Sequence, residues 1–183
     1  MQHTFADAWY GTGDDMLVGA PADGKMYVSI LPTLVATFSR GSVTINSTDT
    51  SDNPVIQSGL LADKRDQEIA VAAFKRARQI GAANAFKEIF TGPEAFPGEK
   101  VKTDDQILAH IKRTTSPIWH ASGTCRMGRS NDTKAVVDSK AQVYGVKGLR
   151  VVDASAFPLL VPCHPQATVY ALAEKIAAAI LGK

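Results

Sequence analysis

The sequence predicts a mixed α/β (α+β) chain, with a mostly antiparallel sheet and long helices followed by one short strand and a last helix. Three observations lead to this prediction. β-Branched and aromatic residues concentrate before residue 46, and apolar residues recur at helical spacing over residues 63–90. The chain then closes with an apolar strand that leads into an apolar helix.

The composition is that of an ordinary globular protein. The 183 residues are 45% hydrophobic and 21% charged, which excludes the disordered and fibrous classes. A formal charge of +2 with scattered charged residues gives no basic stripe, so we expect no nucleic-acid partner. No apolar run approaches the length of a membrane span and the start lacks a signal-peptide pattern, so we expect no membrane partner either.

The first part of the chain predicts a loop and then strands. Residues 1–25 are expected to be irregular because glycine, proline and polar residues are mixed there without a period. Two strands are predicted over residues 26–31 and 34–38, which Pro32 separates. The alternating segment 42–46 predicts a third strand, joined to the second by a tight turn.

Helices are predicted in the middle and at the end of the chain. Residues 63–90 predict one long helix, or two with a break at Gly81. Thr103 and Gln106 have the spacing of a capping box, which predicts a short amphipathic helix after them. Residues 165–181 predict a last helix with proline in its first turn.

Three extended segments are predicted between these helices. Residues 135–138 and 141–144 have the pattern of paired strands joined by a short polar link. Residues 148–153 predict a short buried strand that ends on an acid, Asp153.

Two histidines on short polar loops are the strongest sign of chemistry. Histidine changes its charge near neutral pH, because its ordinary pKa is about 6.5. His120 and His164 together could therefore draw a proton from an alcohol and hold the oxygen that remains. A single loop histidine is more often a surface residue, so this hypothesis depends on the residues around the two.

Four blocks of sequence surround these histidines in a fixed order: HASGTCRMG at 120–128, VD at 137–138, VYGVKGLRVVDAS at 143–155 and HPQATVY at 164–170. In this order they resemble the carboxyl-terminal part of the glucose-methanol-choline (GMC) oxidoreductases, FAD enzymes that oxidise alcohols, such as the fungal aryl-alcohol oxidase and glucose oxidase types. The resemblance implies an antiparallel substrate-domain sheet with helices, plus the last strand and helix of an FAD-binding domain.

The resemblance also implies a division of the chain. Residues 1–25 would be an irregular segment, 26–116 part of a substrate-binding domain, and 117–183 a carboxyl-terminal segment that carries catalytic and FAD-contacting residues.

Roles for individual residues follow from the same resemblance. It makes His120 the base that accepts the hydroxyl proton, and His164 the residue that holds the oxygen of a small alcohol substrate. Trp119 precedes the base and would flank the flavin ring or the substrate. A tryptophan in a loop is equally suited to anchoring packing, so both interpretations stay open.

The cofactor is expected to be FAD, contacted by two short segments. Asp153 and Ala154 would bring backbone amides and a carboxylate toward its phosphate and ribityl chain, although Asp153 could instead cap a turn or helix. Pro165 and Gln166 open the last helix, whose positive amino end suits the negative pyrimidine side of a reduced flavin.

One family feature is missing from this sequence. The strand and Gly-x-Gly-x-x-Gly turn that bind the pyrophosphate do not occur, since Met16 takes the position of the last glycine in the nearest match, which begins at Gly11. We therefore expect a missing amino-terminal half to hold most of the FAD. The chain alone is expected to bind no FAD stably and to oxidise no alcohol.

Two alternatives are weighed against the enzyme. The chain could be a truncated, non-catalytic substrate-domain module without flavin. A metal site built from His120, Cys125, Cys163 and His164 is not predicted, because their loose spacing does not specify a tetrahedral cluster. Both cysteines are expected to be free thiols, with one bridge between them left open.

Overall fold

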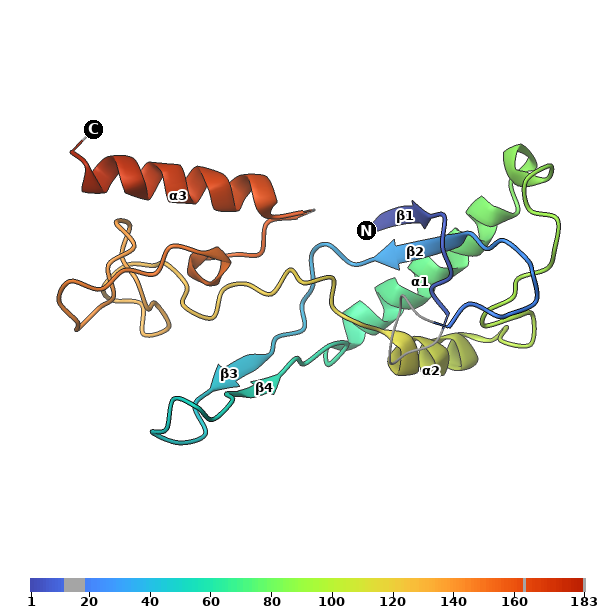
Figure 1. The fold of residues 1–183 in the computed structure, drawn as a ribbon. Helices are drawn as coiled ribbons and strands as arrows, with labels where there is room; N and C mark the ends of the chain where they lie inside the picture. Colours follow the sequence, from blue (N-terminus) through green and yellow to red (C-terminus); the bar gives the residue numbers. More distant parts are fainter. Residues whose placement is uncertain (12–18, 163, 183) are drawn as a thin grey trace. The chain divides into compact units, whose positions relative to one another are not determined.

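The structure is a computed structural model that describes residues 1–11, 19–162 and 164–182 (Figure 1). Two compact units form: unit 1 comprises Met1–Arg40 and Gly59–Ser116, and unit 2 comprises Gly41–Ser58 and Pro117–Lys183. Helices and small antiparallel sheets are both present, so the mixed class is confirmed at this level. The described residues form two separate two-stranded sheets rather than one larger sheet.

Unit 1 begins with a strand that the sequence analysis missed. Strand β1 (Gln2–Ala6) pairs antiparallel with β2 (Ser29–Thr33), so the prediction of an irregular start was wrong for these residues. Long-range contacts hold β1 in place, since Phe5 stacks on Phe86 with ring centroids 5.4 Å apart. Such contacts leave no periodic signal in five residues. The rest of the predicted Gly11 to Met16 match lies outside the described residues.

Proline does not divide the next strand as predicted. Pro32 lies inside β2, opposite His3 of β1. Each strand of a two-stranded sheet keeps one open edge, where the missing N–H of proline costs no hydrogen bond. Residues 34–38 form no strand, and at the end of this segment the backbone N–H of Phe38 donates to the carboxylate of Asp66 instead of to a neighbouring strand.

Two capped helices make the core of unit 1. Helix α1 (Lys64–Gly81) begins after Asp63, whose side chain accepts the N–H of Arg65, and it ends at the predicted break. A short 3-10 helix, η1 (Asn84–Phe86), follows. Helix α2 (Asp104–Thr114) carries the predicted capping box. Helix α1 packs on β2 and on α2, and burial is deepest at Ala73 of α1 and Ile107 of α2.

A buried carboxylate ties the chain before α1 to this core. Asp66 is 1% exposed and accepts the N–H of Phe38 at 3.0 and 3.1 Å and the N–H of Ser39 at 2.6 Å. Burial opposes ionisation of this group, but the hydrogen bonds from Ser39 and Phe38 outweigh it and hold the pKa of Asp66 below its usual range.

We predict that Asp66→Ala lowers the free energy of unfolding by about 2 to 3 kcal/mol, because two backbone N–H groups lose a charged acceptor. Urea unfolding followed by circular dichroism measures the loss. The ionised carboxylate is the stabilising form. The contribution of Asp66 to the free energy of unfolding is therefore fully present above the ordinary aspartate pKa of about 3.9. It disappears as the pH falls through the lowered pKa of Asp66 in the folded state.

The control for this prediction is Glu68→Ala, on the exposed side of the same helix. That change is expected to stay within about 0.5 kcal/mol. Equal decreases in the free energy of unfolding for the Asp66→Ala and Glu68→Ala variants would contradict the anchoring role of Asp66.

Unit 2 contains the second sheet. Strand β3 (Ser42–Thr44) pairs antiparallel with β4 (Val55–Gln57), so the third predicted strand exists but is shorter than predicted. The predicted pairing with 34–38 was wrong. The polar loop between β3 and β4 closes the hairpin instead, and it is held by local hydrogen bonds such as the one from Ser47 to Asp52 at 2.6 Å.

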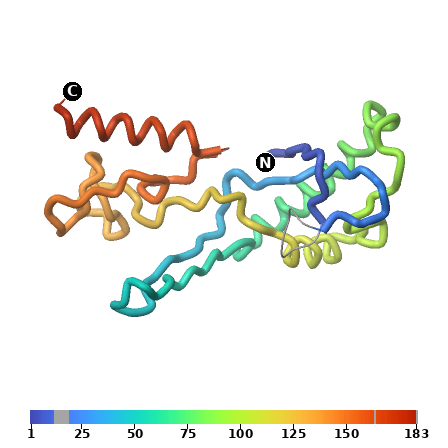
Figure 2. The backbone as a smooth tube through the Cα atoms, in the orientation of Figure 1, coloured from blue at the N-terminus to red at the C-terminus, as the bar shows by residue number. Residues whose placement is uncertain are grey.

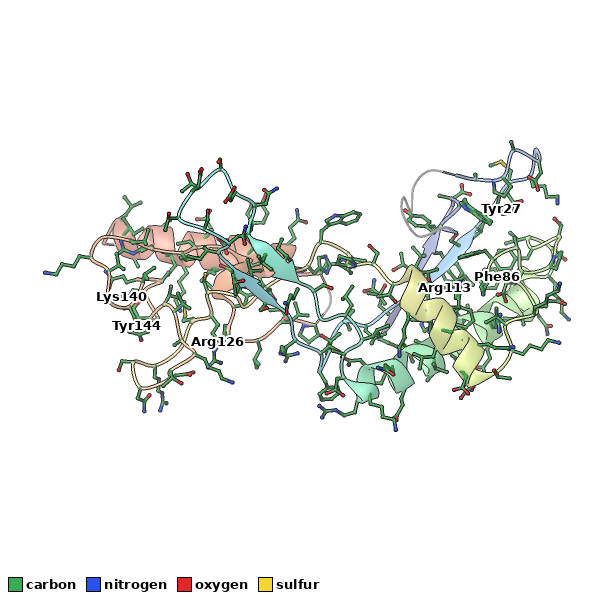
Figure 3. The ribbon with its side chains drawn as sticks, turned by 90° about the horizontal axis from the view of Figure 1, so that it is seen from below. Tyr27, Phe86, Arg113, Arg126, Lys140 and Tyr144 are labelled. Carbon is green, nitrogen blue, oxygen red and sulfur yellow. The ribbon has the colours of Figure 1, made fainter. Side chains whose placement is uncertain are left out.

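The three extended segments predicted between the helices pair only at single residues. Val137 bridges to Met127 and Val143, and Gln142 bridges to Arg150, but no strand forms there in the described part of the chain. Residues with positive φ interrupt the pairing, because they turn the backbone every few residues. Figure 3 labels Lys140 and Tyr144 in this part of the chain, and Figure 2 shows its irregular path.

The predicted strand ending at Asp153 is also a turn structure. A 3-10 helix, η2 (Ala154–Ala156), follows this residue, and the carboxylate of Asp153 accepts the N–H of Ser155 at 2.7 Å. The side chain of Asp153 thus caps η2, and the predicted contact of its backbone with FAD stays a prediction. Helix α3 (Gln166–Ile180) ends the fold as predicted, with Ile176 buried and Ile180 57% exposed.

Large apolar side chains are exposed, among them Ile45, Trp119 and Leu159. No helix within the described ranges has the length and apolar character needed to cross a membrane.

Candidate active site

The structure brings the two predicted histidines together within unit 2. Nδ1 of His164 lies 3.3 Å from Nε2 of His120, although 44 residues separate them in the sequence. The ring centroids are 4.9 Å apart and the rings are nearly perpendicular, at 87°. This distance is near the upper limit of a hydrogen bond, in which one nitrogen donates a proton to the other.

A ladder of backbone hydrogen bonds positions the loop of His120. The N–H groups of Gly123, Cys125 and Met127 donate to the carbonyl groups of residues 154, 155 and 156, at 3.1, 2.9 and 2.9 Å. The loop is therefore fixed along η2, whose first residue contributes to the same pocket as His120. His164 is positioned differently, because it lies directly before Pro165, the cap of α3.

The electrostatic environment favours a neutral His120. Burial lowers the pKa of His120, and its electrostatic interaction with His164 lowers it further. Both effects favour the neutral ring, whose bare nitrogen can accept a proton.

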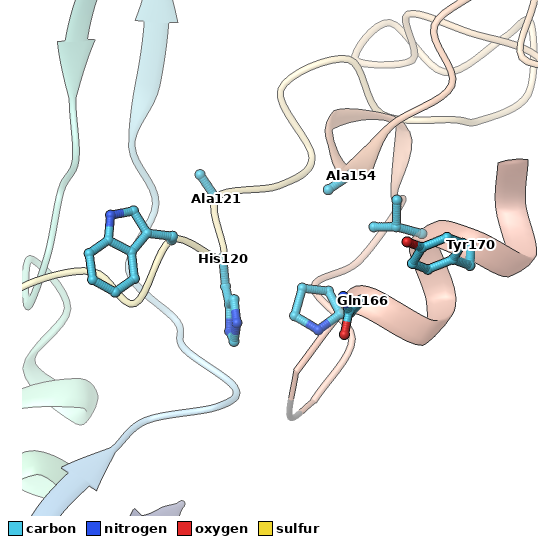
Figure 4. Close-up of a pocket in the computed structure, with 8 residues that line it drawn as sticks. His120, Ala121, Ala154, Gln166 and Tyr170 are labelled. Atoms are coloured by element: carbon cyan, nitrogen blue, oxygen red, sulfur yellow. The ribbon is translucent and has the colours of Figure 1, made fainter. Parts of the chain in front are cut away.

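The histidine loop and α3 line an open, shallow pocket of about 290 Å³ (Figure 4). In Figure 4, Gln166 and Tyr170 belong to α3, while His120 and Ala121 belong to the loop. The pocket is lined by Trp119, His120, Ala121, Ala154, Pro165, Gln166, Val169 and Tyr170.

Most of the predicted site residues are thus gathered in one place. Asp153 and His164 do not line the pocket: the side chain of Asp153 caps η2, and His164 instead lies beside the ring of His120. The sequence analysis missed Ala121, Val169 and Tyr170. Val169 and Tyr170 could have been predicted from the sequence. A helix that begins at Gln166 places the residues three and four positions later on the same face as Gln166.

The amino end of α3 is suited to an electron-rich group. Helices α1 and α2 have side-chain caps at this end, but α3 begins at Pro165 without a side-chain cap. The N–H groups of its first turn therefore keep their positive partial charge, and Pro165 and Gln166 line the pocket at that point. A helix end of this kind can hold an anion or a group rich in acceptors.

The structure offers no separate support for a metal site. Among the residues it describes, no group of three or more His, Cys, Asp or Glu side chains is arranged to hold an ion. Cys125 is a free thiol, whereas Cys163 lies outside the described residues.

Comparison with known proteins identifies the family. Residues 37–173 match the family model described as GMC oxidoreductase. Patulin synthase of Penicillium expansum is 52% identical over 174 residues, which cover 95% of this chain and 28% of that protein. The chain therefore spans only about a quarter of the length of such relatives.

Solved structures agree with this assignment. An FAD-dependent oxidoreductase from Chaetomium thermophilum matches 86% of this chain and 26% of its own, with 32% identity and a TM-score of 0.74. A fungal aryl-alcohol oxidase matches 91% of this chain and 27% of its own, with 28% identity and a TM-score of 0.70. By sequence and by fold, this chain belongs to the GMC oxidoreductase family.

Proposed function

We propose that this chain supplies the catalytic histidines and part of the flavin site of an FAD-dependent enzyme that oxidises a small alcohol. The observation that carries the proposal is the 3.3 Å approach of His164 Nδ1 to His120 Nε2. His120 of this pair lines the same pocket as Pro165 and Gln166 at the uncapped end of α3.

Each histidine has one task in this proposal. Because the two nitrogens are 3.3 Å apart, a single alcohol oxygen can reach both at hydrogen-bond distances of about 2.7 to 3.2 Å. The hydroxyl group donates its proton to Nε2 of His120, and Nδ1–H of His164 donates to the same oxygen. Holding the oxygen in this way stabilises the negative charge that develops on it.

The residues on the α3 side fit a flavin. Pro165 and Gln166 would hold its electron-rich pyrimidine side at the positive end of the helix, and Ala154 would contact it from η2. When bound, FAD supplies an acceptor for the hydride that leaves the alcohol carbon. The O–H proton would pass to Nε2 of His120, and a bound flavin would supply the acceptor for the C–H hydride, which would leave a carbonyl group.

Most of the FAD would be held by another part of the protein. The chain lacks the Gly-x-Gly-x-x-Gly turn, spans about a quarter of its relatives, and exposes a large apolar surface. We propose that an amino-terminal region covers this surface and binds the pyrophosphate.

A reconstituted enzyme tests the proposal. In this enzyme, the present chain replaces the region of patulin synthase that it matches. The amino-terminal region of patulin synthase is kept. We predict that this enzyme retains FAD through gel filtration and that a primary alcohol bleaches the flavin absorbance without oxygen. The chain alone is predicted to retain no FAD. An enzyme that holds FAD but is reduced by no alcohol would favour the alternative of a non-catalytic module.

A further inference from the structure

The loop that carries His120 is held by a very short helix. The N–H groups of Gly123, Cys125 and Met127 donate to the three carbonyl groups of η2 (Ala154–Ala156), at 3.1, 2.9 and 2.9 Å. The first of these bonds lies three residues after His120 in the chain. The orientation of η2 therefore sets the course of the loop, and the first residue of η2 lines the same pocket as His120 (Figure 4).

One side chain fixes the geometry of η2 at its start. The carboxylate of Asp153 accepts the N–H of Ser155 at 2.7 Å, and the carbonyl group of Asp153 accepts the N–H of Ala156 at 3.1 Å. A single 3-10 turn has few hydrogen bonds of its own, so a cap contributes a large share of its stability. Asp153 itself is exposed and does not line the pocket, so the effect of its side chain on the pocket passes through η2.

We infer that Asp153 is a positioning residue for the base: its carboxylate holds η2 in place, and η2 holds the loop that carries His120. This inference rests on the proposed function. The sequence analysis assigned Asp153 to the cofactor, whereas the inference gives its side chain a role that an uncharged hydrogen-bond acceptor can also perform. His164 lies directly before Pro165, the cap of α3, so its contact with the alcohol oxygen does not depend on Asp153.

Three substitutions in the reconstituted enzyme test this role by steady-state kinetics with a primary alcohol. Asp153→Ala removes the cap and is expected to lower kcat about 3- to 30-fold with little change of KM, because the base is displaced while His164 still binds the alcohol. Asp153→Asn keeps a side-chain oxygen that can accept the N–H of Ser155, so its kcat is expected to stay within about 2-fold of wild type.

Asp49→Ala is the matched control for these variants. The carboxylate of Asp49 accepts the N–H of Ser51 at 2.9 Å, in the exposed loop between β3 and β4 of the same unit, and Asp49 does not line the pocket. This substitution removes the same kind of hydrogen bond as Asp153→Ala, and kcat is expected to remain at the wild-type value.

The pH profile separates positioning from a general loss of stability. The pKa of His120 is lowered by burial and by His164, so a displaced ring is expected to titrate closer to the ordinary value of about 6.5. The acid midpoint of kcat/KM is therefore expected to rise in Asp153→Ala and to stay at the wild-type value in Asp153→Asn.

Two results with an active enzyme would overturn the inference. One is a wild-type kcat in Asp153→Ala. The other is an equal loss of activity or of FAD in Asp153→Ala and Asp153→Asn, which would make the charge of the carboxylate the important property. If no alcohol reduces the wild-type enzyme, the proposed function fails separately, and hydrogen–deuterium exchange over residues 121–127 decides the inference. Exchange is expected to be faster in Asp153→Ala than in wild type or Asp153→Asn, and equal exchange in all three would overturn it.

Discussion

Replacing His120 with alanine in the reconstituted enzyme is expected to slow flavin reduction by an alcohol about 100- to 10,000-fold. This is the usual contribution of a positioned general base. The pKa of His120 is lowered by burial and by His164, so the wild-type ring is ready to accept a proton at neutral pH. FAD content is expected to change little, because a base acts mainly in the transition state. Anaerobic stopped-flow absorbance measures the rate.

Two controls separate lost chemistry from lost structure in this variant. Added imidazole is expected to restore part of the rate, because it can occupy the space of the missing ring. His3→Gln changes a histidine of unit 1 that contacts the carbonyl of Ala73, and its rate is expected to match wild type. A His120→Ala enzyme that is reduced at the wild-type rate would remove His120 from the mechanism.

Replacing His164 with alanine is expected to reduce kcat/KM about 10- to 1,000-fold and also to raise KM. A residue that holds the alcohol oxygen contacts both the bound substrate and the transition state, so binding and rate both suffer. Steady-state kinetics with a primary alcohol separates the two effects.

The conservative variant of this prediction is His164→Asn. Its amide N–H can still donate to the oxygen, so it is expected to recover much of the loss seen with alanine. A His164→Ala enzyme with a changed kcat but the wild-type KM would contradict the role of His164 in binding the alcohol.

The elements whose signals are local were predictable from the sequence. The capping box of Thr103 and Gln106, the break at Gly81 and the last helix after Pro165 each depend on neighbouring residues, and each is present in the structure. The histidine pair was predictable for another reason. Motifs in a fixed order, rather than any periodicity, pointed to His120 and His164 together.

The elements that depend on distant contacts were not predictable. Strand β1 forms because its residues reach β2, η1 and the carbonyl of Ala73, which no window of the sequence shows. At the end of the predicted strand 34–38, the N–H of Phe38 donates to the buried carboxylate of Asp66, which lies 28 residues further along the chain. Positive φ angles at Gly145 and Gly148 reduce the later strands to single bridges.

The pH dependence of kcat/KM in the reconstituted enzyme tests most directly whether a neutral His120 accepts the alcohol proton. Only the neutral ring of His120 can accept the alcohol proton, and the pKa of this ring is lowered by burial and by His164. The account predicts a plateau at neutral pH and a fall in acid, with a midpoint below the ordinary histidine pKa of about 6.5. His164→Asn should move this midpoint upward, because the interaction with His164 that lowers the pKa of His120 is removed, and His120→Gln should lack the acid fall. An acid fall with the same midpoint in all three enzymes would contradict the account.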